Sequence, residues 1–170
     1  MRFMMLMIPK GYESAKPGAT PPAERVAAMM KYNESLQKAG VLLALDGLHP
    51  PSMGSRVSFA GGKPKVTDGP FAEAKEVLGG YWMIQVKSKQ EAVEWARRCP
   101  ASPDETIEVR QVQEMSDFPP DVRQAAEGFP EMQAQSARKR GAPKTTTTTS
   151  GNTSASTRRR SRPVRKASHN

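Results

Sequence analysis

The chain has 170 residues, enough for one domain of ordinary size, and 36% of them are hydrophobic. It carries 26 Lys and Arg residues against 17 Asp and Glu residues, and its one cysteine excludes an intramolecular disulfide. The apolar run Phe3–Ile8 is far too short to span a membrane and has no signal-peptide cleavage site after it, so we expect a cytoplasmic protein without a membrane span.

The positive charge is concentrated at the C-terminal end. After Glu131 there is no acidic or aromatic residue but ten Lys and Arg residues, so residues 1–131 keep 16 Lys and Arg against all 17 acidic residues. The run Thr145–Thr149 and its Ser/Gly/Asn neighbours offer nothing apolar to offset the entropy of ordering a backbone. We expect a folded domain over residues 1–115, a linker with a short helix over 116–131, and a disordered basic tail over 132–170.

The start of the chain predicts a strand, a helix and a second strand. Phe3–Ile8 is an unbroken apolar run, which is typical of a strand buried on both faces. Pro22 is well placed to open a helix over residues 24–38, and Gly40 to end it. Val41–Leu45 is the second apolar strand, which leads into a loop with paired prolines.

Apolar residues at helical spacing follow one side of the predicted helix: Val26, Met29, Met30 and Leu36. Such a stripe usually packs in a core, so we predict core positions rather than a ligand site. Trp82 and Tyr81 are expected to fill the core or a subunit interface for the same reason. Cys99 is expected to be a small core residue.

A hairpin is predicted in the middle of the chain. Arg56–Ala60 and Lys65–Thr67 flank two glycines at 61 and 62, whose tolerance of positive φ suits a tight turn. The following stretch, Phe71–Leu78, holds good helix formers but ends at a Gly-Gly pair, so we predict a turn or a brief helix there.

The last part of the domain repeats the strand, helix, strand order. Tyr81–Val86 is a strong strand, and Ser88 with Glu91 has the spacing of a capping box that opens a helix through Arg98. A final strand follows around Ile107–Val109, before paired prolines at the edge of the domain.

This order predicts a ferredoxin-like α+β fold with an extra hairpin in the middle. Two helices can cover only one face of the sheet, whereas the first strand is apolar on both faces. The second face therefore needs a cover, and a second copy of the chain is the most economical one. We expect a homodimer that forms through the open face of the sheet.

Signatures of metal, nucleotide and nucleophile chemistry are missing from residues 1–131. One histidine and one cysteine there cannot form a His/Cys zinc cluster. Neither G-x-x-x-x-G-K-[ST] nor G-x-G-x-x-G occurs, and no G-x-S-x-G elbow is present. We therefore expect no metal and no cofactor, and acid–base catalysis is the candidate chemistry that remains.

Four blocks of sequence resemble one family of small bacterial proteins. The longest is VTDGPFAEAKEVLGGYWMI at residues 66–84, supported by AGVLLALDGLHPP at 39–51, EAVEWARRCP at 91–100 and IEVRQV at 107–112. Their order is that of the YCII-related, or DGPF, family, which the chain resembles over residues 1–112. The resemblance implies a dimeric α/β-barrel built from ferredoxin-like protomers.

On activity the resemblance gives only broad guidance. In YCII-like proteins a histidine and an aspartate face a cleft, some relatives resemble lyases or isomerases, and DGPF members often accompany extracytoplasmic-function sigma factors. It therefore implies a small-molecule-binding domain, with acid–base chemistry as one hypothesis and a non-enzymatic regulatory role as the other. Neither hypothesis assigns a substrate or decides whether the chain is an enzyme.

Asp68, the aspartate of the DGPF motif, is the first catalytic candidate. Partial burial beside Phe71 would raise the pKa of its carboxyl group and suit a general base, but an aspartate before Gly-Pro also commonly caps its own turn. His49 is the second candidate, because Asp68 could orient its imidazole, and a solvated loop histidine is the alternative. Both interpretations of each residue stay open.

Six further residues are expected to border this cleft: Asp46, Gly69, Pro70, Phe71, Glu73 and Lys75. Charged side chains beside a turn are usually solvated, so a simple surface role is the alternative for the charged members. The expected occupant is a small anionic or aromatic molecule.

The basic tail suggests a separate, nucleic-acid-binding activity. Nine of its ten cations form two clusters: Arg138, Lys139 and Arg140, and Arg158, Arg159, Arg160, Arg162, Arg165 and Lys166. Such clusters neutralise phosphates without any fold, so binding would be non-specific and sensitive to salt. No aromatic residue is interleaved to stack on bases, and a merely solvated tail is the alternative.

Overall fold

The computed structural model describes residues 1–71, 74 and 76–126; the predicted tail over 132–170 lies outside these residues. In chain order the strands and helices are β1 (Arg2–Pro9), α1 (Ala23–Lys38), β2 (Leu42–Gly47), β3 (Ser55–Ser58), β4 (Lys65–Asp68), β5 (Gly80–Gln85), α2 (Lys89–Arg97), β6 (Glu105–Gln111) and α3 (Pro120–Ala126). This is the predicted order, and the ferredoxin-like α+β fold is confirmed.

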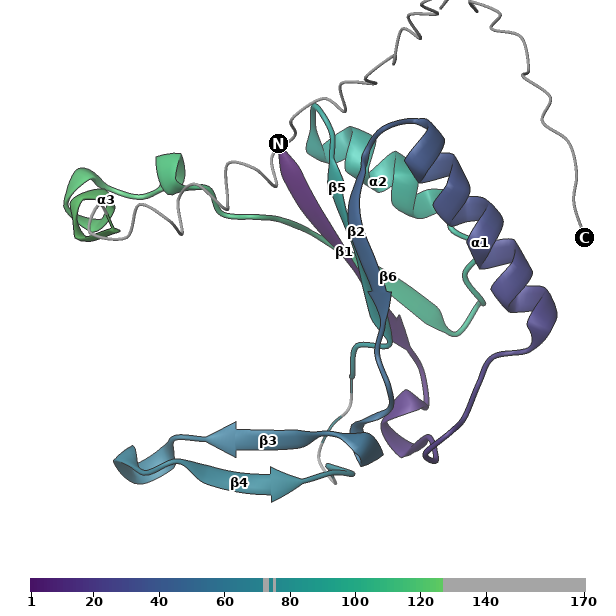
Figure 1. Ribbon diagram of the computed structural model, residues 1–170, viewed down its shortest axis with the longest axis horizontal. Coiled ribbons are helices and arrows are strands. Elements are labelled where there is room, and N and C mark those ends of the chain that lie inside the picture. Colours follow the sequence, from purple (N-terminus) through teal and green to yellow (C-terminus); the bar gives the residue numbers. More distant parts are fainter. Residues whose placement is uncertain (72–73, 75, 127–170) are drawn as a thin grey trace, which may run out of the picture.

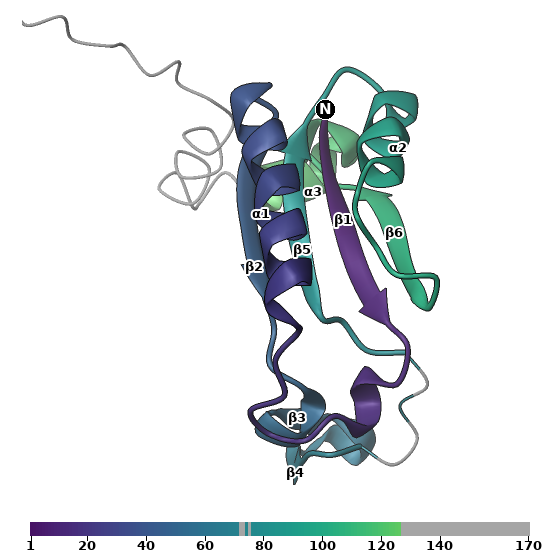
Figure 2. The same cartoon turned by 90° about the vertical axis from the view of Figure 1, so that its right-hand side faces the viewer.

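Four of the strands form one antiparallel sheet in the order β2-β5-β1-β6. Each strand–helix–strand half thus contributes one central and one edge strand. α1 and α2 cover one face of the sheet, while the β3–β4 hairpin and α3 project from the other side (Figures 1 and 2). The fold therefore has two layers, with one face of the sheet left without a helix among the described residues.

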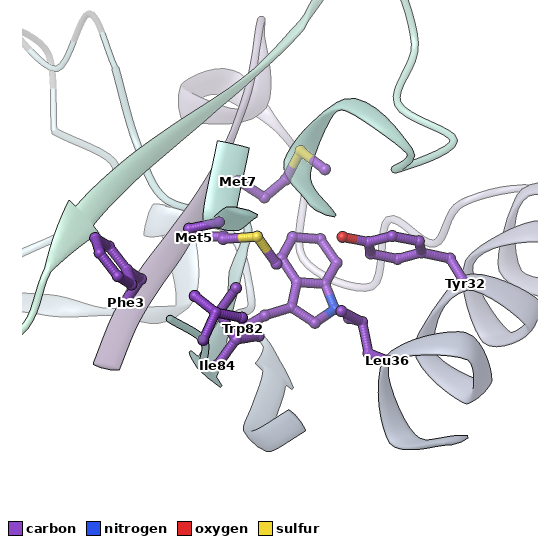
Figure 3. Packing of buried hydrophobic residues seen from close by; sticks show 9 residues of the cluster. Phe3, Met5, Met7, Tyr32, Leu36, Trp82 and Ile84 are labelled. Atoms are coloured by element: carbon purple, nitrogen blue, oxygen red, sulfur yellow. The ribbon is translucent and has the colours of Figure 1, made fainter. Parts of the chain in front are cut away.

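The core lies between the sheet and the two helices. Alternate residues of β1 and β5 form this core together with two large side chains of α1 (Figure 3), and the set is Phe3, Met5, Met7, Tyr32, Leu36, Trp82 and Ile84. The rings of Tyr32 and Trp82 meet edge to face, with centroids 5.8 Å apart. The Tyr32 hydroxyl also donates a hydrogen bond of 2.8 Å to the carbonyl of Trp95 on α2, so this core joins both helices to the sheet.

Helix ends and turns follow the local signals in the sequence. Ser88 caps α2, because its hydroxyl accepts a hydrogen bond from the backbone N–H of Glu91. Gly40 follows α1 with a φ of 70°, and the hairpin turn uses glycines at 61 and 62 with φ of 74° and 77°. The described residues of 71–78 form no helix. No helix of the described chain is long and apolar enough to cross a membrane.

The apolar side of α1 departs from the prediction. Leu36 is fully buried, but Val26 is 45% exposed and Met30 is 61% exposed. The prediction that the whole side belongs to the core was therefore wrong for Val26 and Met30. The physical reason is that Tyr32 and Trp82 fill the space under the second half of α1, whereas a cavity lies under the first half.

The face of the sheet opposite the helices, called the open face below, is apolar at its centre. Strand register places on it Met4, Leu6, Ile8, Ala44 and Met83. Leu6 is buried by its neighbours, and the other four side chains are only partly buried. No helix of the described residues covers this face (Figure 1).

Candidate functional site

The main candidate site is a cavity of about 620 Å³ between the first turns of α1, the sheet and the loop after β1. We call it the helix–sheet cavity. Its apolar lining includes Met7, Val26, Met29, Met30, Leu45 and Trp82. The volume falls within the range of about 300 to 1,000 Å³ that is usual for small-molecule sites, and such sites are mainly apolar.

Two hydrogen bonds hold the loop after β1 at one end of the cavity. The Tyr12 hydroxyl donates to the carbonyl of Leu48 at 2.7 Å, and the Ser52 hydroxyl donates to the carbonyl of Ala15 at 3.0 Å. Gly79 forms part of the lining there, and a Cβ atom at this position would come within 2.7 Å of the Pro9 side chain. These contacts join the loop after β1 to the loop after β2 and to the residue before β5 at this end of the cavity.

An ion pair across the layers forms part of the polar lining. Nη2 of Arg25 on α1 donates to both carboxylate oxygens of Glu105 on β6, each at 2.7 Å. The backbone N–H of Ser102 also donates to Glu105, at 2.7 Å. Burial alone would raise the pKa of Glu105, but the hydrogen bonds from Arg25 and Ser102 and the charge of Arg25 outweigh it and lower that pKa.

Asn33 supplies a second polar group to the cavity. Its Oδ1 accepts a hydrogen bond of 2.8 Å from the indole N–H of Trp82, and its Nδ2 faces the sulfur of Met30 at 3.9 Å. A thioether is a weak acceptor, so the amide N–H groups of Asn33 keep most of their capacity to donate.

Asp46 and Tyr81 border the cavity, but their side chains belong to the open face. They lie opposite each other in the register, and Tyr81 also lies opposite Leu6. The Tyr81 hydroxyl donates to Oδ2 of Asp46 at 2.7 Å. This hydrogen bond is the main reason that the pKa of Tyr81 is raised, with desolvation and the charge of Asp46 adding to it.

His49 and Phe71 line a smaller hollow of about 400 Å³ at the base of the β3–β4 hairpin. We call it the loop cleft. The guanidinium of Arg56 lies over the Phe71 ring, 4.0 Å from its centroid, and Glu76 is a further charged residue of the lining. The loop cleft thus combines an aromatic wall with a histidine and groups of both charges.

Asp68 is exposed at the end of β4, and its carboxylate accepts a hydrogen bond of 2.6 Å from the Ser55 hydroxyl. No hydrogen bond or ion pair between Asp68 and His49 occurs in the described structure, and Asp68, Gly69 and Pro70 are not among the residues that line either hollow. The expected cleft residues Glu73 and Lys75 lie outside the described residues.

Sequence reasoning missed Arg25, Asn33 and Glu105. They occupy separate elements, Arg25 and Glu105 are 80 positions apart, and no motif contains them. The one sequence signal near this cavity was the row of apolar residues at helical spacing on α1, and that spacing predicted a core rather than a binding site. Within the described residues, no group of three His, Cys, Asp or Glu side chains lies close enough to hold a metal ion.

The sheet order, the two helices on one face and the inserted hairpin define the class of a ferredoxin-like α+β domain. The chain belongs to the YCII-related domain family, whose model matches residues 1–116. An uncharacterised protein of Rhizobium meliloti (strain 1021) is 38% identical over 71 residues, which is 42% of this chain and 54% of that protein. The match thus spans about half the length of this relative.

Proposed function

We propose that this YCII-related domain binds a small, mainly apolar molecule in the helix–sheet cavity. The observation that carries the proposal is the exposure of Val26 and Met30 above a cavity of about 620 Å³ whose walls are largely apolar. A ligand that covers these side chains gains roughly 25 cal/mol for each Å² of apolar surface removed from water. The flexible thioethers of Met29 and Met30 can adapt to its shape.

A thermal-shift screen of the full-length protein with small aromatic and aliphatic compounds tests this proposal. Compounds that raise the melting temperature should lose their effect in Met29→Trp, because the indole fills the cavity. Met30→Trp at the mouth is a second blocking variant in case the first does not fold. Val93→Trp, on the exposed surface of α2, is the matched control and should keep the response. Equal responses of all variants would rule out the cavity as the binding site.

A second copy of the chain is the proposed cover of the open face. Support comes from the partly exposed apolar side chains at its centre and from the β3–β4 hairpin, which projects on the same side (Figure 1). Val57 and Val66 lie opposite each other on one face of this hairpin and are 52% and 64% exposed. An isolated two-stranded hairpin is at best marginally stable, so a partner surface would stabilise it.

Proton transfer at the loop cleft is proposed as a second function, with His49, which lines the cleft, as one acid–base group and Asp68, whose carboxylate lies outside the lining, as the other. It is supported by the position of His49 in the lining of the cleft and by the hydrogen bond of 2.8 Å from the Gly69 N–H to the Gly54 carbonyl, which joins the Asp68 turn to the same loop. Small acids that stabilise the protein should lose this effect in Asp68→Asn. Equal stabilisation of both proteins would remove Asp68 from the site.

The alternative function is that of a regulatory or accessory module whose basic tail binds nucleic acid without sequence preference. The charge distribution favours it, because ten Lys and Arg residues and no acidic residue follow Glu131. A mobility-shift assay with duplex DNA should show binding by the full chain that weakens with salt, and loss of binding by a chain shortened to end at Glu131. Identical behaviour of the two chains would exclude the tail.

A further inference from the structure

We infer that the ligand of the helix–sheet cavity is uncharged and apolar with a carbonyl-type hydrogen-bond acceptor, and that Arg25 donates to this acceptor. The inference rests on the proposed function, since it names the chemical class that the same cavity would take. The chemical class of the ligand follows from which of the hydrogen-bond donors and acceptors that line the cavity already have partners in the described part of the chain.

Arg25 keeps donors that the protein does not use. A guanidinium has five N–H groups in a planar fork, and only Nη2 is engaged, with the two oxygens of Glu105. In the described part of the chain, Nε and Nη1 of Arg25 have no acceptor. The side chain is 42% exposed and lines the cavity, so these donors are accessible to a bound molecule.

Asn33 points to the same class of ligand. Its acceptor oxygen is occupied by the Trp82 indole, and its N–H groups have only the weak Met30 sulfur as a partner. The unused capacity at Arg25 and Asn33 is therefore donor capacity. A ligand with an acceptor oxygen complements both residues, whereas a ligand that carries only donors does not.

The charge balance favours an uncharged acceptor over a carboxylate. Glu105 accepts from Arg25 with both oxygens and from the Ser102 N–H, and its side chain is only 11% exposed, so it holds the guanidinium in place and cancels its charge. An anion would thus meet a guanidinium whose charge is already neutralised, next to the carboxylate of Glu105, while a carbonyl gains the hydrogen bonds without that repulsion.

Three probes of nearly equal shape separate these cases: 2-acetylnaphthalene, 2-naphthoate and 2-ethylnaphthalene. Calorimetric titration of the full-length protein should show the tightest binding for the ketone, with the hydrocarbon and the carboxylate each about tenfold weaker. Arg25→Met keeps the apolar part of the side chain, and its affinity for the ketone should fall to its affinity for the hydrocarbon. Arg97→Met, which removes an exposed arginine of α2, should leave all three affinities unchanged.

Glu105→Gln tests the role of Glu105 as a positioning residue that also sets the charge preference. Without the neutralising carboxylate, binding of 2-naphthoate should strengthen relative to the ketone by about tenfold. A purely structural role of Glu105 would weaken all three probes equally and would contradict this part of the inference.

The outcomes also distinguish the inference from the proposed function. If 2-naphthoate binds wild type best, or if Arg25→Met leaves the preference for the ketone intact, the inference is overturned. The helix–sheet cavity remains the proposed binding site in that case, provided that Met29→Trp blocks binding. If compounds bind and Met29→Trp blocks none of them while its far-UV circular dichroism matches wild type, the proposed function itself fails.

Discussion

A Cβ atom at Gly69 would collide with the carbonyl oxygen of Pro51, because the two backbones touch at the base of the β3–β4 hairpin. The N–H of Gly69 donates to the carbonyl of Gly54 at 2.8 Å in the same place. The glycine of the DGPF motif is therefore required by packing, and it joins the hairpin to the loop that carries His49. Gly69 of the motif thus has a structural role, which is separate from any role of Asp68.

Gly69→Ala should destabilise the protein by about 2 kcal/mol or more, because the added methyl group meets rigid backbone rather than a flexible side chain. Gly54→Ala is the matched control. A Cβ atom at Gly54 would lie 3.7 Å from the Pro51 oxygen, an ordinary contact, and its φ of −120° suits any residue. Urea unfolding followed by circular dichroism measures both, and similar losses would contradict the role of the Gly69 contact.

Met83→Lys should weaken the proposed homodimer, because it places a charge at the centre of the open face, opposite Met4 and Ala44. Sedimentation velocity at micromolar concentration should show a dimer for wild type and a shift toward monomer for the variant. Val93→Lys, on the far layer of the fold, should sediment like wild type. A wild-type monomer under these conditions would exclude the proposed dimer.

Acidification should remove part of the stability through Glu105. The pKa of this carboxyl group is lower in the folded protein than its ordinary value of 4.5, so the folded state favours the ionised form. Its contribution is present above pH 4.5 and is lost as the pH falls through the lowered pKa. In Glu105→Gln the free energy of unfolding should depend less on pH in this acidic range. Glu94→Gln, in an exposed pair with Arg97, should keep the wild-type dependence.

Cys99 should react slowly with thiol reagents in the folded protein. Burial, assisted by the negative charge of Glu105, raises the pKa of its thiol from 9.0 to about 11. Because the thiolate is the reactive form, alkylation by iodoacetamide at pH 8 should be on the order of 100-fold slower than in urea. The rate should increase in Glu105→Gln, and equal rates in folded and unfolded protein would contradict the raised pKa.

The candidate site shows where sequence reasoning reached its limit. The motif pointed to Asp68, and the position of His49 in the loop after the second strand made it the second candidate. The structure places His49 in the lining of the loop cleft, whereas Asp68 lies outside that lining and is hydrogen-bonded to Ser55. The apolar residues Val26 and Met30 were expected in the core, but they are exposed and line a cavity. Helical spacing identifies the apolar side of a helix, but it does not reveal whether that side touches the next layer along its whole length.

Local features of the sequence by themselves determined the elements of this protein, because the apolar runs of the strands, the Ser88 cap and the Gly40 stop each act over a few neighbouring residues. Only the tertiary structure decided that Arg25 and Glu105, 80 positions apart, meet beside a cavity under α1. The contact needs α1 to pack on the sheet beside β6, and the edge-to-face packing of Tyr32 on α1 against Trp82 on β5 is part of that packing. These residues are far apart in the sequence, so no local pattern encodes their contact.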